Sequence, residues 1–348
     1  MQREAEGAVF SPTGLFFKHF LDRANGRGHN LPFLQKLRTV RFLINSTAKY
    51  DPDEYQPFDL YGSLNLIRRL PAIESVRVDG IMEPIRSSIE LPPRTANYSK
   101  IEIRHSSMDY PYLIHTIRSA KTLREFTYTI GGHGSNNDSI AMLNPDDLFR
   151  TLLEYWDSLE YLDLDVEAEL SLKEIFDPNV GRLFFGDYRS WYGPAYFYEW
   201  EGELGERPED NILLTERPPP TCCFLRRFTK LRSLSIGIHL LYYFARGIDN
   251  DRLSEEVFSL ADRLPPNLES LRIYGYAKGM EPWVEGLPPH IFDDMLSQLV
   301  KEKDEKLPLL THIAGIEELI DHAATLRRPV NPEDVWKREV DQWTEYEY

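Results

Sequence analysis

The stretch "NLESLRIYGY" at residues 267–276 places Leu268, Leu271 and Ile273 in an apolar-x-x-apolar-x-apolar frame with polar residues between them. The alternation is typical of a half-buried strand, because successive side chains of a strand point to opposite faces. A single stretch of this kind occurs in many folds. Its recurrence along the chain is therefore what decides the fold.

The frame recurs seven times before this stretch, at intervals of 21 to 51 residues. Its leading residues are Leu37, Ile73, Tyr98, Leu123, Leu159, Val180 and Leu231. A degraded further copy follows in "LPLLTHIAGI" at 307–316. Each copy predicts one short strand, with its leading apolar residue filling the turn into that strand.

Helical spacing appears between the copies. In "NPDDLFRTLLEYW" (144–156), Asn144 is the expected N-cap and Pro145 the first helical residue, and Leu148, Leu152 and Trp156 recur at i, i+4 and i+8. The segments 111–121, 253–264 and 288–303 also predict helices. Strands and helices alternating at this period predict an α/β solenoid, an open arc of short parallel strands with helices on its convex side.

The repeats resemble those of fungal F-box-type leucine-rich-repeat proteins, in both the L-x-x-L-x-L frame and phrases such as "LPPNLESLRI" and "AKTLREFTY". The resemblance covers the repeat region, roughly 31–316, and no F-box is visible. It implies a substrate-recognition part of a ubiquitin-ligase subunit. A cullin-type ubiquitin-ligase adaptor is then an expected partner if an F-box lies upstream.

The repeats also predict the domain organisation. We expect a helical lead-in at 1–30, a repeat domain at 31–325 and a capping segment at 326–348, where Trp336, Val340 and Trp343 have near-helical spacing. The structural alternative is a two-domain α/β enzyme. Its buried parallel strands would read as near-continuous apolar runs, whereas these strands are short and half polar.

Composition excludes several classes of function. Forty Lys and Arg against 56 Asp and Glu give a net charge of −16, which disfavours a nucleic-acid partner. No apolar run approaches the roughly 18 residues of a membrane span. The two cysteines, Cys222 and Cys223, are adjacent and are expected to be reduced thiols, so we predict an intracellular protein, cytoplasmic or nuclear.

Signals for catalysis are weak, and we predict no catalytic residue, metal or cofactor. The Gly-rich "GGHGSNNDS" (131–139) lacks the Lys-Ser/Thr pair that ends a phosphate-binding loop. Glu318 and His322, at i and i+4 with Asp321 beside them, are two potential metal ligands without a second cluster. The alternative function, a hydrolase or metal-dependent enzyme, would depend on such a cluster.

A protein partner of unknown identity is the expected ligand. Strand positions between the apolar anchors point away from the core, and they are net basic in the N-terminal third and acidic in the middle of the chain, a pattern that would orient a partner. The predicted binding residues on this concave face are Arg41, Arg77, Lys100, Arg104, Glu125, Tyr161, Asp163, Asp165, Arg182, Phe184, Arg272 and Tyr274.

An aromatic-rich insertion at 187–221 is the second candidate interface. Loops of this length are usually functional or disordered, and disordered segments are poor in aromatic residues. Tyr and Trp also dominate interface hot spots. The predicted binding residues here are Trp191, Tyr192, Tyr196, Tyr198 and Trp200. The alternative, that these rings pack against the repeats, stays open.

Overall fold

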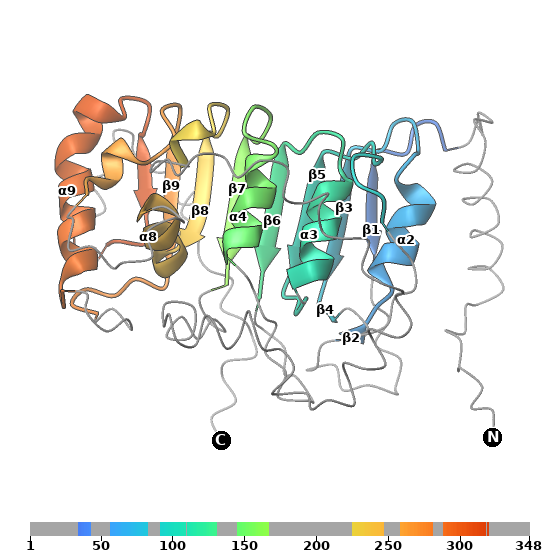
Figure 1. Ribbon diagram of the computed structural model, residues 1–348, viewed down its shortest axis with the longest axis horizontal. Helices are drawn as coiled ribbons and strands as arrows, with labels where there is room; N and C mark the ends of the chain where they lie inside the picture. The colour runs from blue at the N-terminus through green and yellow to red at the C-terminus, as the bar shows by residue number, and fades with distance from the viewer. Residues whose placement is uncertain are drawn as a thin grey trace, which may run out of the picture. The chain divides into compact units, whose positions relative to one another are not determined.

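The computed structural model describes residues 34–42, 56–82, 91–108, 110–130, 145–166, 225–246, 258–280, 288–317 and 319. The chain divides into two compact units between Met142 and Leu143. The described residues before this boundary form the N-terminal unit, and those after it form the C-terminal unit. Both units contain parallel strands and helices, so the predicted α/β class is confirmed (Figure 1).

Four parallel strands form the sheet of the N-terminal unit. They are β1 (Thr39–Phe42), β3 (Ser75–Asp79), β5 (Lys100–Arg104) and β6 (Glu125–Thr129), and each pairs with the next in chain order. A separate pair joins β2 (Gln56–Pro57) to β4 (Ile81–Met82). The helices α2 (Leu60–Ile67) and α3 (Tyr110–Ser119) lie on one side of the four strands (Figure 1).

The C-terminal unit repeats this arrangement. Its strands β7 (Tyr161–Asp165), β8 (Ser233–Gly237), β9 (Ser270–Tyr274) and β10 (His312–Ala314) are also parallel and also pair in chain order. Its helices are α4 (Pro145–Leu153), α8 (Ile238–Arg246) and α9 (Ile291–Lys306), with short 3-10 turns η2 (Leu225–Arg227) and η3 (Leu260–Asp262). None of the helices in the described ranges is long and apolar enough to cross a membrane.

The repeat frame places each strand as predicted. Seven predicted copies and the degraded final copy coincide with β1, β3, β5, β6, β7, β8, β9 and β10, while the copy led by Val180 lies outside the described residues. The leading residues Leu123, Leu159, Leu231 and Leu268 are fully buried. Leu37, at the first copy, is half-buried.

One backbone hydrogen-bond pattern recurs at the junctions between copies. In the N-terminal unit, the carbonyl oxygen of Arg38 accepts the N–H groups of Glu74 and Ser75, and the carbonyl oxygen of Glu74 accepts those of Ser99 and Lys100. The same pattern links successive copies in the C-terminal unit. There, the accepting carbonyl oxygens belong to Glu160, Arg232 and Glu269. The residue after each leading apolar position is thus structurally equivalent from copy to copy.

Local sequence explains where the helices begin and end. The side chain of Asp59 accepts the N–H of Gly62 at 2.8 Å and caps α2, whose Leu60, Leu64 and Ile67 are buried. In α4, Leu148 and Leu152 are buried as predicted. Trp156 does not extend this stripe, because the helix ends at Leu153 and Trp156 is 44% exposed.

Tighter turns after α4 cause this difference. The N–H groups of Glu154, Tyr155 and Trp156 each donate to the carbonyl three residues earlier, which rotates the chain relative to an α-helix. Tyr155 therefore occupies the buried position. The prediction of a helix over 253–264 is wrong for its described part, 258–264, where the 3-10 turn η3 is the only helical element. Pro265 disfavours helical geometry at the residue before it.

Candidate functional site

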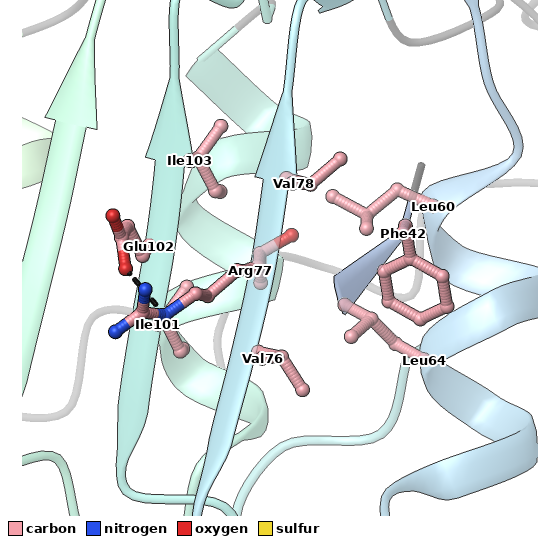
Figure 2. Close-up of a pocket in the computed structure, with 10 residues that line it drawn as sticks. Phe42, Leu60, Leu64, Val76, Arg77, Val78, Ile101, Glu102 and Ile103 are labelled. Carbon is pink, nitrogen blue, oxygen red and sulfur yellow. Dashed lines mark ion pairs between the residues drawn. The ribbon is translucent and has the colours of Figure 1, made fainter. Parts of the chain in front are cut away.

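Each sheet has a second face that points away from its apolar core. In β3, Val76 and Val78 are buried, whereas the intervening Arg77 side chain is 55% exposed. Figure 2 shows the two valines directed toward Phe42, Leu60 and Leu64, with Arg77 turned toward Glu102. We call this second side the polar face of each unit.

The polar face is defined by alternate strand positions. In the N-terminal unit it contains Thr39, Arg41, Ser75, Arg77, Asp79, Lys100, Glu102, Arg104, Glu125, Thr127 and Thr129. In the C-terminal unit it contains Tyr161, Asp163, Asp165, Ser233, Ser235, Ser270, Arg272, Tyr274, His312 and Ala314. Strand register sorts these residues into rows that run across the strands.

The central row of the N-terminal polar face concentrates charge on Glu102. Register places Arg41 opposite Arg77, Arg77 opposite Glu102, and Glu102 opposite Thr127. Glu102 Oε2 lies 2.8 Å from Arg77 Nε, and its Oε1 lies 2.6 Å from Arg104 Nε. One carboxylate therefore holds two guanidinium groups in place.

An ion pair and a hydrogen-bond contact to a histidine flank this row. Lys100 Nζ lies 2.5 Å from Glu125 Oε1, between register partners on β5 and β6. Asp79 Oδ1 lies 3.0 Å from His105 Nδ1, at the carboxyl ends of β3 and β5. These side chains are 30–44% exposed, so the pairs contribute more to orientation than to stability.

His105 has an unusual backbone conformation. Its φ is 44°, whereas glycines with φ of 68° and 69°, Gly80 and Gly275, follow β3 and β9 at the corresponding position. A side chain in this region costs about 1–2 kcal/mol. The backbone N–H of His105 donates to Thr129 Oγ1 at 2.9 Å, which with the contact to Asp79 fixes this corner of the polar face.

A buried carboxylate organises the C-terminal polar face. Asp163 is 6% exposed and accepts hydrogen bonds from the hydroxyls of Tyr274 at 2.8 Å and Tyr161 at 3.1 Å. Tyr274 belongs to β9 and Asp163 to β7, so this bond crosses β8. Burial, and then the neighbouring Asp163 carboxylate, raise the pKa of Tyr274 above its ordinary range.

The burial of Asp163 and Tyr274 differs from the expected exposure. Strand alternation places both residues on the polar face, as predicted, but Tyr274 is only 8% exposed. Register places the small residues Ser235 and Gly237 of β8 beside Asp163 and Tyr274 respectively. These small residues leave room for the Tyr274 ring to reach across the strand and cover the carboxylate.

The structure brings most of the predicted binding residues together in two groups. Arg41, Arg77, Lys100, Arg104 and Glu125 share the N-terminal polar face, and the C-terminal polar face holds another five. Those five are Tyr161, Asp163, Asp165, Arg272 and Tyr274. Without counting histidines, the N-terminal polar face has four cationic side chains and three carboxylates. The C-terminal polar face has one cationic side chain and two carboxylates.

The remaining candidates lie outside the described residues. They are Arg182 and Phe184, the insertion residues Trp191, Tyr192, Tyr196, Tyr198 and Trp200, the two cysteines, and Glu318, Asp321 and His322. The sequence did not predict the contribution of His105 to the polar face or the hydrogen bond from Tyr274 to Asp163. The only signal for His105 was its place directly after a strand, where two other repeats have glycine, Gly80 and Gly275.

The cavity drawn in Figure 2 is too small for a substrate. It measures about 10 Å³ and is lined mainly by apolar residues of α2, β3 and β5, so it has room for about one water molecule. In the described part of the chain, no three His, Cys, Asp or Glu residues gather as metal ligands. No protein-family model, curated protein or solved structure matches this chain.

Proposed function

We propose that the chain is an irregular leucine-rich-repeat solenoid that acts as a non-enzymatic scaffold and binds another protein on its polar faces. The pairing of parallel strands in chain order within each unit supports this architecture. The recurring junction hydrogen bonds support it as well. A doubly wound sheet would instead reverse its strand order at a switch point, and neither unit contains such a reversal among its described strands.

The observation that carries the binding function is the exposure of the N-terminal polar face. Parallel sheets normally have both faces covered, so their strands are apolar on both sides. Here, Arg77, Lys100 and Arg104 have side chains that are 55%, 41% and 45% exposed, on strands whose other side is buried. An ordered and charged surface of this kind suits recognition of a protein with complementary charges.

Ubiquitin-ligase membership is the narrower form of this proposal. By the resemblance of its repeats, the scaffold presents a substrate to a cullin-type complex through an F-box encoded upstream. Affinity purification of the protein tagged at the C-terminus of its native locus tests this form. Cullin-adaptor peptides together with peptides from upstream of Met1 support ligase membership, and their absence refutes it.

Bulky substitutions on the polar faces test the scaffold itself. Thr39→Tyr in the N-terminal unit and Ser270→Tyr in the C-terminal unit add volume on the strands without changing charge. The matched controls are Ser63→Tyr in α2 and Ser297→Tyr in α9, which add the same side chain to half-exposed helix positions.

Quantitative affinity purification then compares the variants with the wild-type protein. The same partner should be depleted about tenfold or more by a strand variant and retained by the helix variants, since lost complementarity of about 1.4 kcal/mol changes affinity tenfold. A partner that binds all four variants equally would refute the polar faces as its docking surface.

A further inference from the structure

We propose that the N-terminal polar face binds an acidic peptide segment of the partner protein, with Arg77 and Arg104 as the anion-binding side chains. This inference rests on the scaffold function proposed above and specifies the chemistry of its partner. The binding group is an oxyanion, either a carboxylate or a phosphate carried on the peptide.

The two guanidinium groups are already oriented for an anion. Glu102 contacts each of them through Nε, at 2.8 Å for Arg77 and 2.6 Å for Arg104. A guanidinium has five N–H donors, of which Nε supplies one. The two arginine side chains are 55% and 45% exposed, so a ligand can reach them from solvent. Guanidinium forks match the geometry of carboxylates and phosphates.

Charge around Glu102 is incompletely compensated. Arg41 is exposed on β1 and directly opposite Arg77 in register. Like charges opposite each other on neighbouring strands destabilise a sheet. The row that contains Arg41, Arg77 and Glu102 therefore has an excess of one positive charge, and the whole N-terminal polar face, with four cations and three carboxylates, has the same excess. An anion bound beside Arg41 and Arg77 would relieve this repulsion.

The same excess stands out against the charge of the whole chain, which is −16. A long polyanion such as a nucleic acid is repelled by the rest of the surface. A short acidic segment lies within about one Debye length, roughly 8–10 Å, of the arginines and avoids most of that repulsion. The cavity beside Arg77 and Glu102 is too small for a compact metabolite, which also favours an extended peptide.

Fluorescence anisotropy with labelled peptides tests the proposal on the full chain. The probes are an oligoglutamate peptide, a matched peptide with phosphoserines, an oligolysine peptide of equal length and a single-stranded RNA. Titrations at low and physiological ionic strength reveal the electrostatic part of binding. The test variant is Arg77→Gln with Arg104→Gln. Its matched control is Arg226→Gln with Arg232→Gln, the same charge change on exposed residues of the C-terminal unit.

We expect the wild-type protein to bind the oligoglutamate or the phosphoserine peptide and to show no detectable binding of oligolysine or RNA. The test variant should weaken binding at least tenfold, and the control less than twofold. Preference for one acidic peptide identifies carboxylate or phosphate as the natural group. If the test variant unfolds, the single change Arg104→Lys keeps the charge, removes the fork, and should still weaken binding several-fold.

Three results would overturn the proposal: no binding of either acidic peptide, equal weakening by both double variants, or tighter binding of RNA or oligolysine. The outcome is separable from that of the scaffold function. If Thr39→Tyr or Ser270→Tyr removes a partner while the acidic peptides do not bind, the scaffold stands and the acidic-segment proposal fails. If neither experiment shows an effect, both fail.

Discussion

Removing the hydroxyl of Tyr274 should destabilise the C-terminal unit. The Tyr274→Phe variant keeps the ring and deletes one donor, which now lies 2.8 Å from Asp163 Oδ1. Asp163 is 6% exposed, so water cannot easily replace that donor. Hydrogen bonds to charged groups contribute about 1.5–3 kcal/mol, and we expect the free energy of unfolding to fall by about 2 kcal/mol.

The assay is urea unfolding at neutral pH, followed by circular dichroism. For a unit of this size, a loss of about 2 kcal/mol should also lower Tm by roughly 4–8 °C. Tyr276→Phe is the matched control. Its hydroxyl also donates to a carboxylate at 2.8 Å, that of Asp293, but in a partly exposed site. There, water can take over as donor, and we expect a loss of about 0.5 kcal/mol.

A double-mutant cycle isolates the interaction with Asp163. Asp163→Asn is combined with Tyr274→Phe, and the coupling should be about 1 kcal/mol or more, because the two groups are in direct contact. If Tyr274→Phe stays within about 0.5 kcal/mol of wild type, or costs no more than Tyr276→Phe, the carboxylate does not depend on this donor. Asp163 would then not be the group that organises the C-terminal polar face.

Three other predictions concern stability. Glu302 accepts hydrogen bonds from Ser259, Gln298 and Lys306, which lower the pKa of Glu302 to about 2. The stability that this group contributes is present above its ordinary pKa of 4.5 and should be lost as the pH falls toward 2. The urea midpoint of the wild-type protein should therefore drop between these pH values, and that of Glu302→Gln should drop less. Gly315→Ala should cost several kcal/mol more than Gly279→Ala in the same assay, because both have positive φ but only a Cβ at Gly315 would meet the Ile273 carbonyl, at 1.9 Å. Leu268→Ala should cost about 3–5 kcal/mol in urea unfolding, and a cost under about 1 kcal/mol would contradict its role as a buried repeat anchor.

The strands could be predicted from sequence, but several helices could not. Alternation over five residues, with a further apolar residue three positions before the first buried strand residue, is a specific signal. It located every described strand except β2 and β4. By contrast, α8 was not predicted. Its "IHLLYYFAR" is buried on nearly all sides, including Ile238, Leu241 and Phe244, so it lacks the polar face that reveals an amphipathic helix.

The contents of the polar faces could be predicted, but not their internal contacts. Alternation tells which side of a sheet Tyr274 occupies, because the period of a strand is two residues. Its burial depends on small residues in the neighbouring strand, Ser235 and Gly237, which come into register only after the repeats pair. The ion pairs on Glu102 depend on register in the same way. Sequence spacing alone cannot supply this, since the intervals between repeats vary from 21 to 51 residues.

The junction hydrogen bonds between repeats have a consequence for how such a protein can change. Donor and acceptor at each junction are backbone groups, such as the Arg232 carbonyl oxygen and the N–H groups of Glu269 and Ser270. Side chains on the polar faces take no part in them. Exposed polar-face residues such as Arg77 and Arg104 can therefore be substituted, and the length between repeats can vary, without changing these backbone contacts. If the polar faces bind a partner as proposed, the specificity of that binding can change at exposed positions while the contacts between repeats are kept.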